Sequence, residues 1–157
     1  MQISNDETWM REAIAEAKRA AVEGEIPIAA IGVIRGEEVG RARNCREIDH
    51  NPLGHAELLL ISHIARELKN WRLEELSLYV TCEPCLMCAG AILQARIPRV
   101  IFGCADPKAG AMGSLYDLSQ DSRLNHRVEV IRGVCAAECG MLLSNFFRDL
   151  RVGYGKR

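Results

Sequence analysis

The sequence predicts an α/β fold of three layers, α/β/α, in which helices cover both faces of a mixed five-stranded sheet. Segments with helical apolar spacing alternate with apolar segments of strand length along the 157 residues. The length and the 48% content of hydrophobic residues suit one globular domain with a full core. No apolar run approaches the roughly 20 residues that a membrane span needs, so no membrane partner is expected.

The first predicted element is a helix over residues 6–24. Its apolar residues recur at helical spacing, from Trp9 through Ala13 and beyond. Asp6 is expected to cap its N-terminus, and Gly24 is expected to end it.

A hairpin, a helix and a buried strand are expected next. Residues 26–35 are mostly apolar and predict a strand, and residues 37–44 return as its antiparallel partner with a turn near Gly36. A second helix is predicted from about Gly54 to Lys69, with a broad apolar face. Residues 76–81 then predict a short buried strand.

The second half of the chain continues the alternation. Pro84 suits the first position of a helix that runs on through "CLMCAGAILQAR". Residues 99–104 predict a buried strand, and residues 105–125 a glycine-rich functional loop with a short helical piece. Residues 126–133 predict a strand and residues 135–151 an amphipathic helix. Strands separated by helices are expected to pair in parallel.

The charge of the chain is uneven. The net charge is −1, but the first 93 residues carry 10 Lys/Arg against 15 Asp/Glu, and the rest carry 10 against 6. A basic C-terminal part is compatible with phosphate contacts, and also with an ordinary solvated surface.

Three of the seven cysteines fall in the stretch "TCEPCLMC", at Cys82, Cys85 and Cys88. The polar start of the chain is unlike a signal peptide, which indicates a reducing cytoplasm where disulfides are rare. The spacing leaves three interpretations open: a redox pair, half of a structural zinc site, or two ligands of a catalytic metal.

The segment "GHAEL" favours the catalytic metal. His55 and Glu57 lie at the start of one predicted helix, and Cys85 and Cys88 lie at the start of another about thirty residues later. The i, i+3 spacing places both sulfurs on one helical face, and a helix N-terminus favours thiolates. One histidine and two cysteines leave a fourth zinc position for water, as in catalytic sites. Glu57 can then exchange protons with that water.

The remaining cysteines and histidines have simpler interpretations. Cys82 belongs to the preceding strand and is expected to line the site without binding metal. Four others are interpreted as small core or surface thiols: Cys45, Cys104, Cys135 and Cys139. His63 lies two helical turns from His55, about 12 Å away, too far to share a metal. His50 and His126 stay open as ligands.

The pattern H-x-E followed by P-C-x-x-C resembles the signature of zinc-dependent base deaminases. Over nearly its full length, the chain resembles the bacterial tRNA adenosine deaminases among them. The zinc signature is shared with cytidine, cytosine, guanine and dCMP deaminases. Four segments are more specific to the tRNA branch: "RIPRVIFG", "GSLYDL", "LNHRVEV" and "FFR".

This resemblance implies a cytidine-deaminase-like fold, with residues 1–157 as a single zinc-dependent deaminase domain. It implies hydrolytic deamination of adenosine to inosine at the wobble position of a tRNA anticodon, by a cytoplasmic homodimer. One Zn²⁺ per chain would be held by His55, Cys85 and Cys88. Glu57 would carry protons from the zinc-bound water to the purine ring and the departing ammonia.

The resemblance also implies which residues contact the substrate: Asn44, Ile28, Ala56, Asp106, Lys108, Phe147 and Arg148. Asn44 would hydrogen-bond the flipped base, and Ile26 and Ile28 would line its pocket. Asp106 and Lys108 would lie in the loop that contacts the anticodon. Phe147 and Arg148 would lie beside the RNA groove.

Two departures from the family pattern bear on the substrate. Asn51-Pro52-Leu53-Gly54 stands where Asp-Pro-Thr-Ala is usual, and Ala29-Ala30 where Gly-Ala is usual. A free nucleobase deaminase, for guanine or cytosine, is therefore the alternative, and a non-catalytic zinc-stabilised RNA-binding module is a third hypothesis. With 5% aromatic residues, few candidates can stack on a flipped base: Phe147, Tyr116 and Phe146, the last with core packing as the favoured role.

Overall fold

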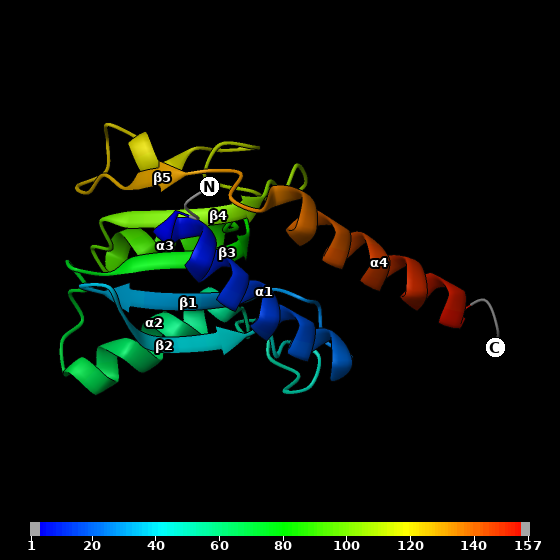
Figure 1. Cartoon of the computed structure of the whole chain (residues 1–157). Helices are drawn as coiled ribbons and strands as arrows, with labels where there is room; N and C mark the ends of the chain where they lie inside the picture. Colours follow the sequence, from blue (N-terminus) through cyan, green and yellow to red (C-terminus); the bar gives the residue numbers. More distant parts are fainter. Residues whose placement is uncertain (1–3, 155–157) are drawn as a thin grey trace.

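The computed structural model describes residues 4–154 and has one five-stranded sheet with the order β2-β1-β3-β4-β5 (Figure 1). β1 is antiparallel to β2 and β3, whereas β3, β4 and β5 are parallel. The elements, in chain order, are α1 (Asn5–Val22), β1 (Ala29–Ile34), β2 (Glu37–Arg43), α2 (Ala56–Leu68), β3 (Ser77–Cys82), α3 (Leu86–Gln94), β4 (Arg99–Cys104), η1 (Leu118–Gln120), β5 (Glu129–Ile131) and α4 (Ala136–Tyr154). The expected mixed α/β sheet is confirmed.

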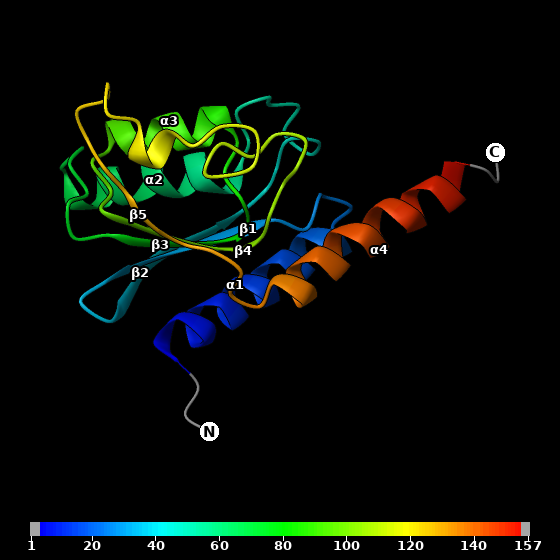
Figure 2. The same ribbon diagram turned by 90° about the horizontal axis from the view of Figure 1, so that it is seen from above.

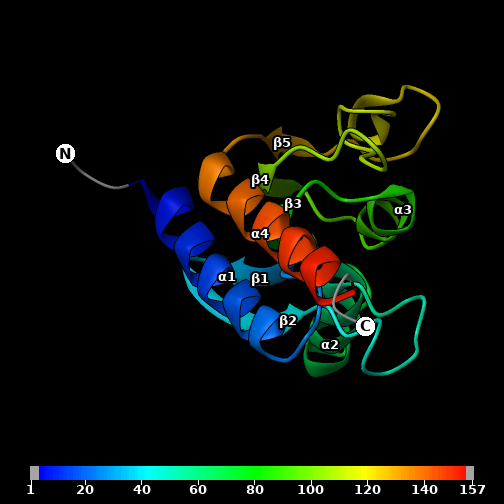
Figure 3. The ribbon, with the colours of Figure 1, turned by 90° about the vertical axis from the view of Figure 1, so that its right-hand side faces the viewer.

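Helices cover the sheet on both faces. α2 and α3 lie on one face, and α1 and α4 lie side by side on the other (Figures 2 and 3). Each face has its own apolar core, one centred on residues such as Leu60, Ile92 and Phe102, the other on residues such as Met10 and Ile101. The second half of α4 extends past the sheet. No helix in the described part of the chain is both long and apolar enough to span a bilayer.

The first helix begins one residue earlier than its sequence pattern predicts. Ser4 caps α1, and its hydroxyl accepts the backbone N–H of Glu7 at 3.2 Å. The predicted cap Asp6 lies inside the helix, where its side chain bonds elsewhere. Gly24 follows the helix with φ +84°, a conformation that glycine adopts without strain, so its predicted role in ending the helix holds.

Other element boundaries also shift by a few residues. α2 begins at Ala56 and not near Gly54. Pro84 precedes α3 by two residues instead of opening it, because Cys85 is the N-cap. β5 is three residues long, although the alternating pattern extended over residues 126–133. It reaches the sheet from the loop that carries η1, with no α-helix between β4 and β5.

The arrangement brings the ends of several elements to one edge of the sheet. β3 and β4 are parallel and in register, so that Cys82 is paired with Cys104 at their carboxyl ends. Because β1 is antiparallel to β3, its amino end at Ala29 lies at the same edge, next to the end of β2 at Arg43. The chain segments that leave or enter these strands therefore meet there, as is usual for binding sites of α/β sheets.

At the opposite edge, Asp6 fastens α1 to the amino ends of β3 and β4. Its carboxylate accepts two hydrogen bonds from the Arg99 guanidinium, at 2.7 and 3.0 Å, and one from the Tyr79 hydroxyl at 2.7 Å. Burial alone would raise the pKa of the Asp6 carboxyl, but these partners prevail and lower it.

Asp6→Asn is expected to lower the free energy of unfolding at neutral pH by about 1–3 kcal/mol, because a charged acceptor is removed from two partly buried donors. The pKa of Asp6 is lowered in the folded protein, so its contribution is present above the pKa of the unfolded chain and is lost as the pH falls through the folded pKa. Urea unfolding of both proteins should therefore show a difference that shrinks in acid. A difference that grows on acidification would contradict this role.

Candidate metal centre and pocket

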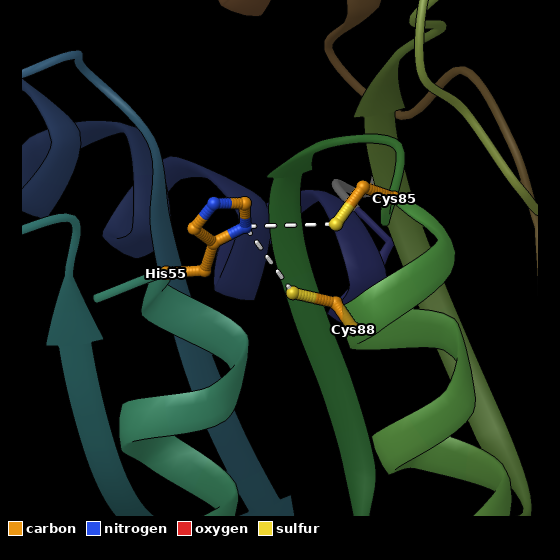
Figure 4. A group of neighbouring side chains, drawn as sticks. All are labelled: His55, Cys85 and Cys88. Atoms are coloured by element: carbon orange, nitrogen blue, oxygen red, sulfur yellow. Dashed lines mark hydrogen bonds between the residues drawn. The ribbon is translucent and has the colours of Figure 1, made fainter. Parts of the chain in front are cut away.

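Two helix N-termini meet at the carboxyl edge of the sheet. His55 is the N-cap residue of α2 and Cys85 is the N-cap residue of α3, and neither side chain caps its own helix. Both side chains are therefore free to point across the gap between the helices, where Cys88 of the first turn of α3 joins them (Figure 4).

The three side chains converge on one point. His55 Nδ1 lies 3.6 Å from Cys85 Sγ and 3.5 Å from Cys88 Sγ. All three ligand atoms lie within 4.8 Å of one another, and in the described residues this is the group of His, Cys, Asp and Glu side chains that could hold a metal ion. Cys82, His50, His63 and His126 are not part of it.

The pKa values of the two thiols, Cys85 and Cys88, are shifted in opposite directions. Hydrogen bonding with Cys88, and secondarily with His55, lowers the pKa of Cys85 to about 4 although burial opposes the loss of its proton. Contact with Cys85, together with burial, raises the pKa of Cys88. One thiolate therefore forms readily, and the second needs a further positive charge. A metal cation supplies that charge, because coordinating thiols lose their protons.

Glu57 lies beside this group in the first turn of α2. Its side chain is only 4% exposed and lines the pocket in front of the metal group. Burial raises the pKa of the Glu57 carboxyl, although hydrogen bonding with Cys88 opposes the effect. A buried carboxyl group with a raised pKa in a cleft is typical of acid–base chemistry.

The pocket has a volume of about 860 Å³ and opens at the carboxyl edge of the sheet. Its walls come from the segments before β1, after β2, before and within α2, after β3 and β4, and from α4. Six of the seven substrate-contact residues that the family resemblance implies line it: Asn44, Ile28, Ala56, Asp106, Lys108 and Phe147. Ile26 also lines it, whereas Ala29 and Ala30 do not.

Arg148 and two of the aromatic candidates lie elsewhere. Arg148 is 64% exposed on α4, and its guanidinium lies 3.5 Å from the Asp149 carboxylate. Tyr116 is exposed on the loop after β4 and does not line the pocket. Phe146 is half-buried and packs edge-on against Phe147, outside both apolar cores, so its expected core role is wrong.

Asn44 is held by the backbone of the segment that follows β2. It is 5% exposed, and its Oδ1 accepts the backbone N–H of Arg46 at 2.8 Å. Its own backbone N–H donates to Ile28 O at 3.0 Å, so the two pocket residues are fixed to each other. The amide is thus oriented by the backbone in the pocket that also contains the metal group.

Sequence reasoning missed several pocket residues. Arg46 and Arg151 add positive charge to the walls, and Cys104 lies beside Cys82 on the pocket surface. Glu83 is a 4% exposed carboxylate between β3 and α3. Burial would raise its pKa, but hydrogen bonds from Ser114 and from loop backbone N–H groups lower it. The sequence offered one clue to Glu83, because it directly precedes Pro84 and the candidate metal ligand Cys85.

Known proteins that are similar to this chain include several deaminases. Residues 4–151 match the MafB19-like deaminase family. The chain is 50% identical over 149 residues to the tRNA-specific adenosine deaminase of Bacillus subtilis (strain 168), covering 95% of this chain and 92% of that protein. The similar protein of Haemophilus influenzae is 43% identical over 93% of this chain and 85% of its own.

Solved structures of deaminases also resemble this chain in fold. A structure from a study of A-to-I editing by tRNA:A34 deaminases at the wobble position of transfer RNA matches with a TM-score of 0.83 and 35% identity, over 87% of this chain and 99% of that one. A guanine deaminase from Nitrosomonas europaea shares the fold, with a TM-score of 0.75 and 19% identity over 89% of this chain and 83% of that one. The chain therefore belongs to the MafB19-like deaminase family and, within it, to the tRNA-specific adenosine deaminases.

Proposed function

We propose that this chain is a zinc-dependent hydrolase that converts adenosine to inosine at the wobble position of a tRNA anticodon. The observation that carries the proposal is the His55–Cys85–Cys88 group with Glu57 beside it, inside a pocket of a chain 50% identical to a tRNA-specific adenosine deaminase.

The donor set suits zinc. One imidazole nitrogen and two thiolates are zinc ligands of the kind found in open catalytic sites. Bonds of about 2.0–2.1 Å to nitrogen and 2.3 Å to sulfur in a tetrahedron separate these two atoms by about 3.6 Å. The spacings from His55 Nδ1 to the Cys85 and Cys88 sulfurs, 3.6 and 3.5 Å, agree with that value.

The chemistry divides between the metal and the chain. Zinc in such a site lowers the pKa of a coordinated water toward about 7, so that a nucleophile is available at neutral pH. Glu57 would accept one proton from the attacking water and deliver it to the purine ring nitrogen, and would then carry the second proton, from the hydroxyl group added to the ring carbon, to the departing amino group. Adenosine and water thereby give inosine and ammonia. The buried position of Glu57 favours this exchange, because a raised pKa lies closer to neutral pH.

The pocket walls supply the contacts to the base. Asn44 is rigidly held and offers its amide to the flipped adenine, while Ile28 and Ala56 pack against the ring. Removing a base from its stack costs a few kcal/mol, and enzymes recover part of it by stacking on apolar or aromatic side chains. Phe147, which is 40% exposed at the pocket, takes that role here.

The outer walls favour a polynucleotide over a free base. Arg46, Lys108 and Arg151 line the pocket and provide cations for phosphate groups, which a free nucleobase lacks. Asp106 shapes the loop that carries Lys108, whereas the charge of Arg148 on α4 is offset by the adjacent Asp149 carboxylate. A guanine or cytosine deaminase would have little use for these cations. The likeness to the guanine deaminase from Nitrosomonas europaea, at 19% identity, shows a common fold and carries no argument for a common substrate.

Several features remain predictions from the family resemblance. They are the anticodon stem-loop as partner, the homodimer, the cytoplasmic location, one zinc ion per chain, and a single deaminase domain over residues 1–157.

The function itself is tested with an anticodon stem-loop that carries a wobble adenosine. The zinc-loaded protein is expected to form inosine in this RNA and to leave free guanine, cytosine and adenosine unchanged. Because the phosphate contacts are electrostatic, the rate at low RNA concentration should fall as salt rises. Turnover of a free base with an untouched stem-loop would show that the alternative, a nucleobase deaminase, is correct.

Glu57→Gln is expected to lower kcat by about 100-fold or more, because the general acid and base is lost. Zinc content should stay unchanged, since Glu57 is not one of the metal ligands. Glu67→Gln, on an exposed position of the same helix, is the matched control and should keep full activity. Unaltered turnover in Glu57→Gln would refute the proton-transfer role.

Metal analysis can test whether Cys85 binds zinc and Cys82 does not. Cys85→Ala is expected to lose most of its zinc, because one of three protein ligands is removed. Cys82→Ser should keep it, since Cys82 lies on β3 outside the metal group. Zinc is measured by atomic emission after gel filtration. Equal loss in both variants would be incompatible with the three-ligand site.

A further inference from the structure

We propose that Glu83 is a positioning residue that fixes residues 106–114, and with them Asp106 and Lys108, against the metal group. This inference rests on the proposed function, because the two residues are substrate contacts there.

Glu83 lies where three parts of the site join. It directly follows the last residue of β3 and precedes Pro84 and the metal ligand Cys85. Its backbone N–H donates to Cys104 O at 2.9 Å, at the end of β4. Its side chain is 4% exposed and turns toward the loop that leaves β4. The residue therefore contacts both the ligand-bearing segment and the pocket wall.

The carboxylate of Glu83 accepts four hydrogen bonds from this loop. Oε1 accepts the backbone N–H of Asp106 at 3.1 Å and the Ser114 hydroxyl. Oε2 accepts the backbone N–H groups of Met112 and Ser114, both at 3.1 Å. All four donors belong to residues 106–114, and no Lys or Arg in the described residues forms an ion pair with Glu83. The negative charge is thus stabilised by the loop alone.

The loop is wrapped tightly around this carboxylate. A Cβ atom at Gly110 would overlap with Glu83 Oε2, so no side chain fits there. Ala111 N–H donates to Pro84 O at 2.9 Å, and Gly110 forms an isolated bridge with Cys85. The path of the loop is therefore fixed relative to the metal ligand.

Asp106 connects the Glu83 carboxylate to the part of the loop that lines the pocket. Its Oδ1 accepts the backbone N–H groups of Lys108 at 3.0 Å and Ala109 at 3.2 Å. The turn that presents Lys108 is thus built on a residue whose own N–H is held by Glu83. Loss of the Glu83 anchor should displace the whole turn.

Glutamine cannot take over the role of Glu83. Both carboxylate oxygens accept backbone N–H groups, and an amide has only one oxygen. In either orientation, the amide nitrogen of a glutamine side chain would face at least one N–H donor, Asp106 on one side or Met112 and Ser114 on the other. A shape-conserving substitution therefore removes the anchor with little change in volume.

The test compares zinc-loaded wild type, Glu83→Gln and Asp6→Asn. Glu83→Gln is expected to keep its zinc but to lose about 10- to 100-fold in kcat/KM on the stem-loop, mainly through KM, because substrate contacts are misplaced. Hydrogen exchange of the amides of Asp106, Met112 and Ser114 should quicken. Asp6→Asn removes a carboxylate at the opposite edge of the sheet. This variant should be less stable, but its KM and the exchange of the three amides should stay as in the wild type.

A second, milder variant keeps the test valid if Glu83→Gln does not fold. Ser114→Ala removes one donor and leaves the carboxylate, so it should raise KM by less. Its effect combined with Glu83→Gln should be less than additive, because both act on the same anchor. Unchanged KM and exchange in Ser114→Ala, or zinc loss parallel to activity loss in Glu83→Gln, would overturn the proposal.

The two proposals can fail separately. If wild-type protein leaves the stem-loop untouched, the proposed function fails while hydrogen exchange still reports on the anchor. If wild type is active and the exchange of the three amides is unaffected in Glu83→Gln, the positioning role alone is wrong.

Discussion

The site depends on the parallel, in-register pairing of β3 with β4. Because the two strands end together at Cys82 and Cys104, the turn into α3 and the loop after β4 start side by side. The start of α2 reaches the same edge from the other part of the sheet. Two N-cap positions thus face each other, and side chains that usually satisfy their own helix are free to bind a metal together.

The electrostatics of this edge follow from the same arrangement. A half-buried histidine, a half-buried and a buried thiol, and the buried carboxyl of Glu57 are gathered at this edge. Among the protein groups alone, the proton is unequally shared: the pKa of Cys85 is lowered while that of Cys88 is raised. A dication in the group would remove this conflict, because coordinated thiols lose their protons.

Buried carboxylates also shape the walls of the pocket. Glu25 is fully buried and its Oε1 accepts the backbone N–H of Ile48, in the segment between β2 and α2. Glu83 binds the loop between β4 and β5 in the same manner, with four donors. The loop after β4 is thus held by hydrogen bonds to a buried carboxylate in addition to the apolar packing of Ala111 and Met112, and its outer face, with Asp106 and Lys108, lines the pocket.

The sequence by itself determined the mixed α/β sheet, the first hairpin, and the chemical identity of the metal group. The periodicity of apolar residues and the composition encode the sheet and the hairpin. The metal group could be recognised because His55 lies at one helix start, and Cys85 and Cys88 lie at another. Sequence reasoning misplaced two helix starts: Ser4 and not Asp6 is the N-cap of α1, and α3 begins after Cys85 and not at Pro84. Asp6 does not cap because its carboxylate binds Arg99 and Tyr79, which are remote in the chain. Only the tertiary structure decided that Glu83, Arg46 and Arg151 belong to the pocket, since the pocket is built from segments that are remote from one another in the chain.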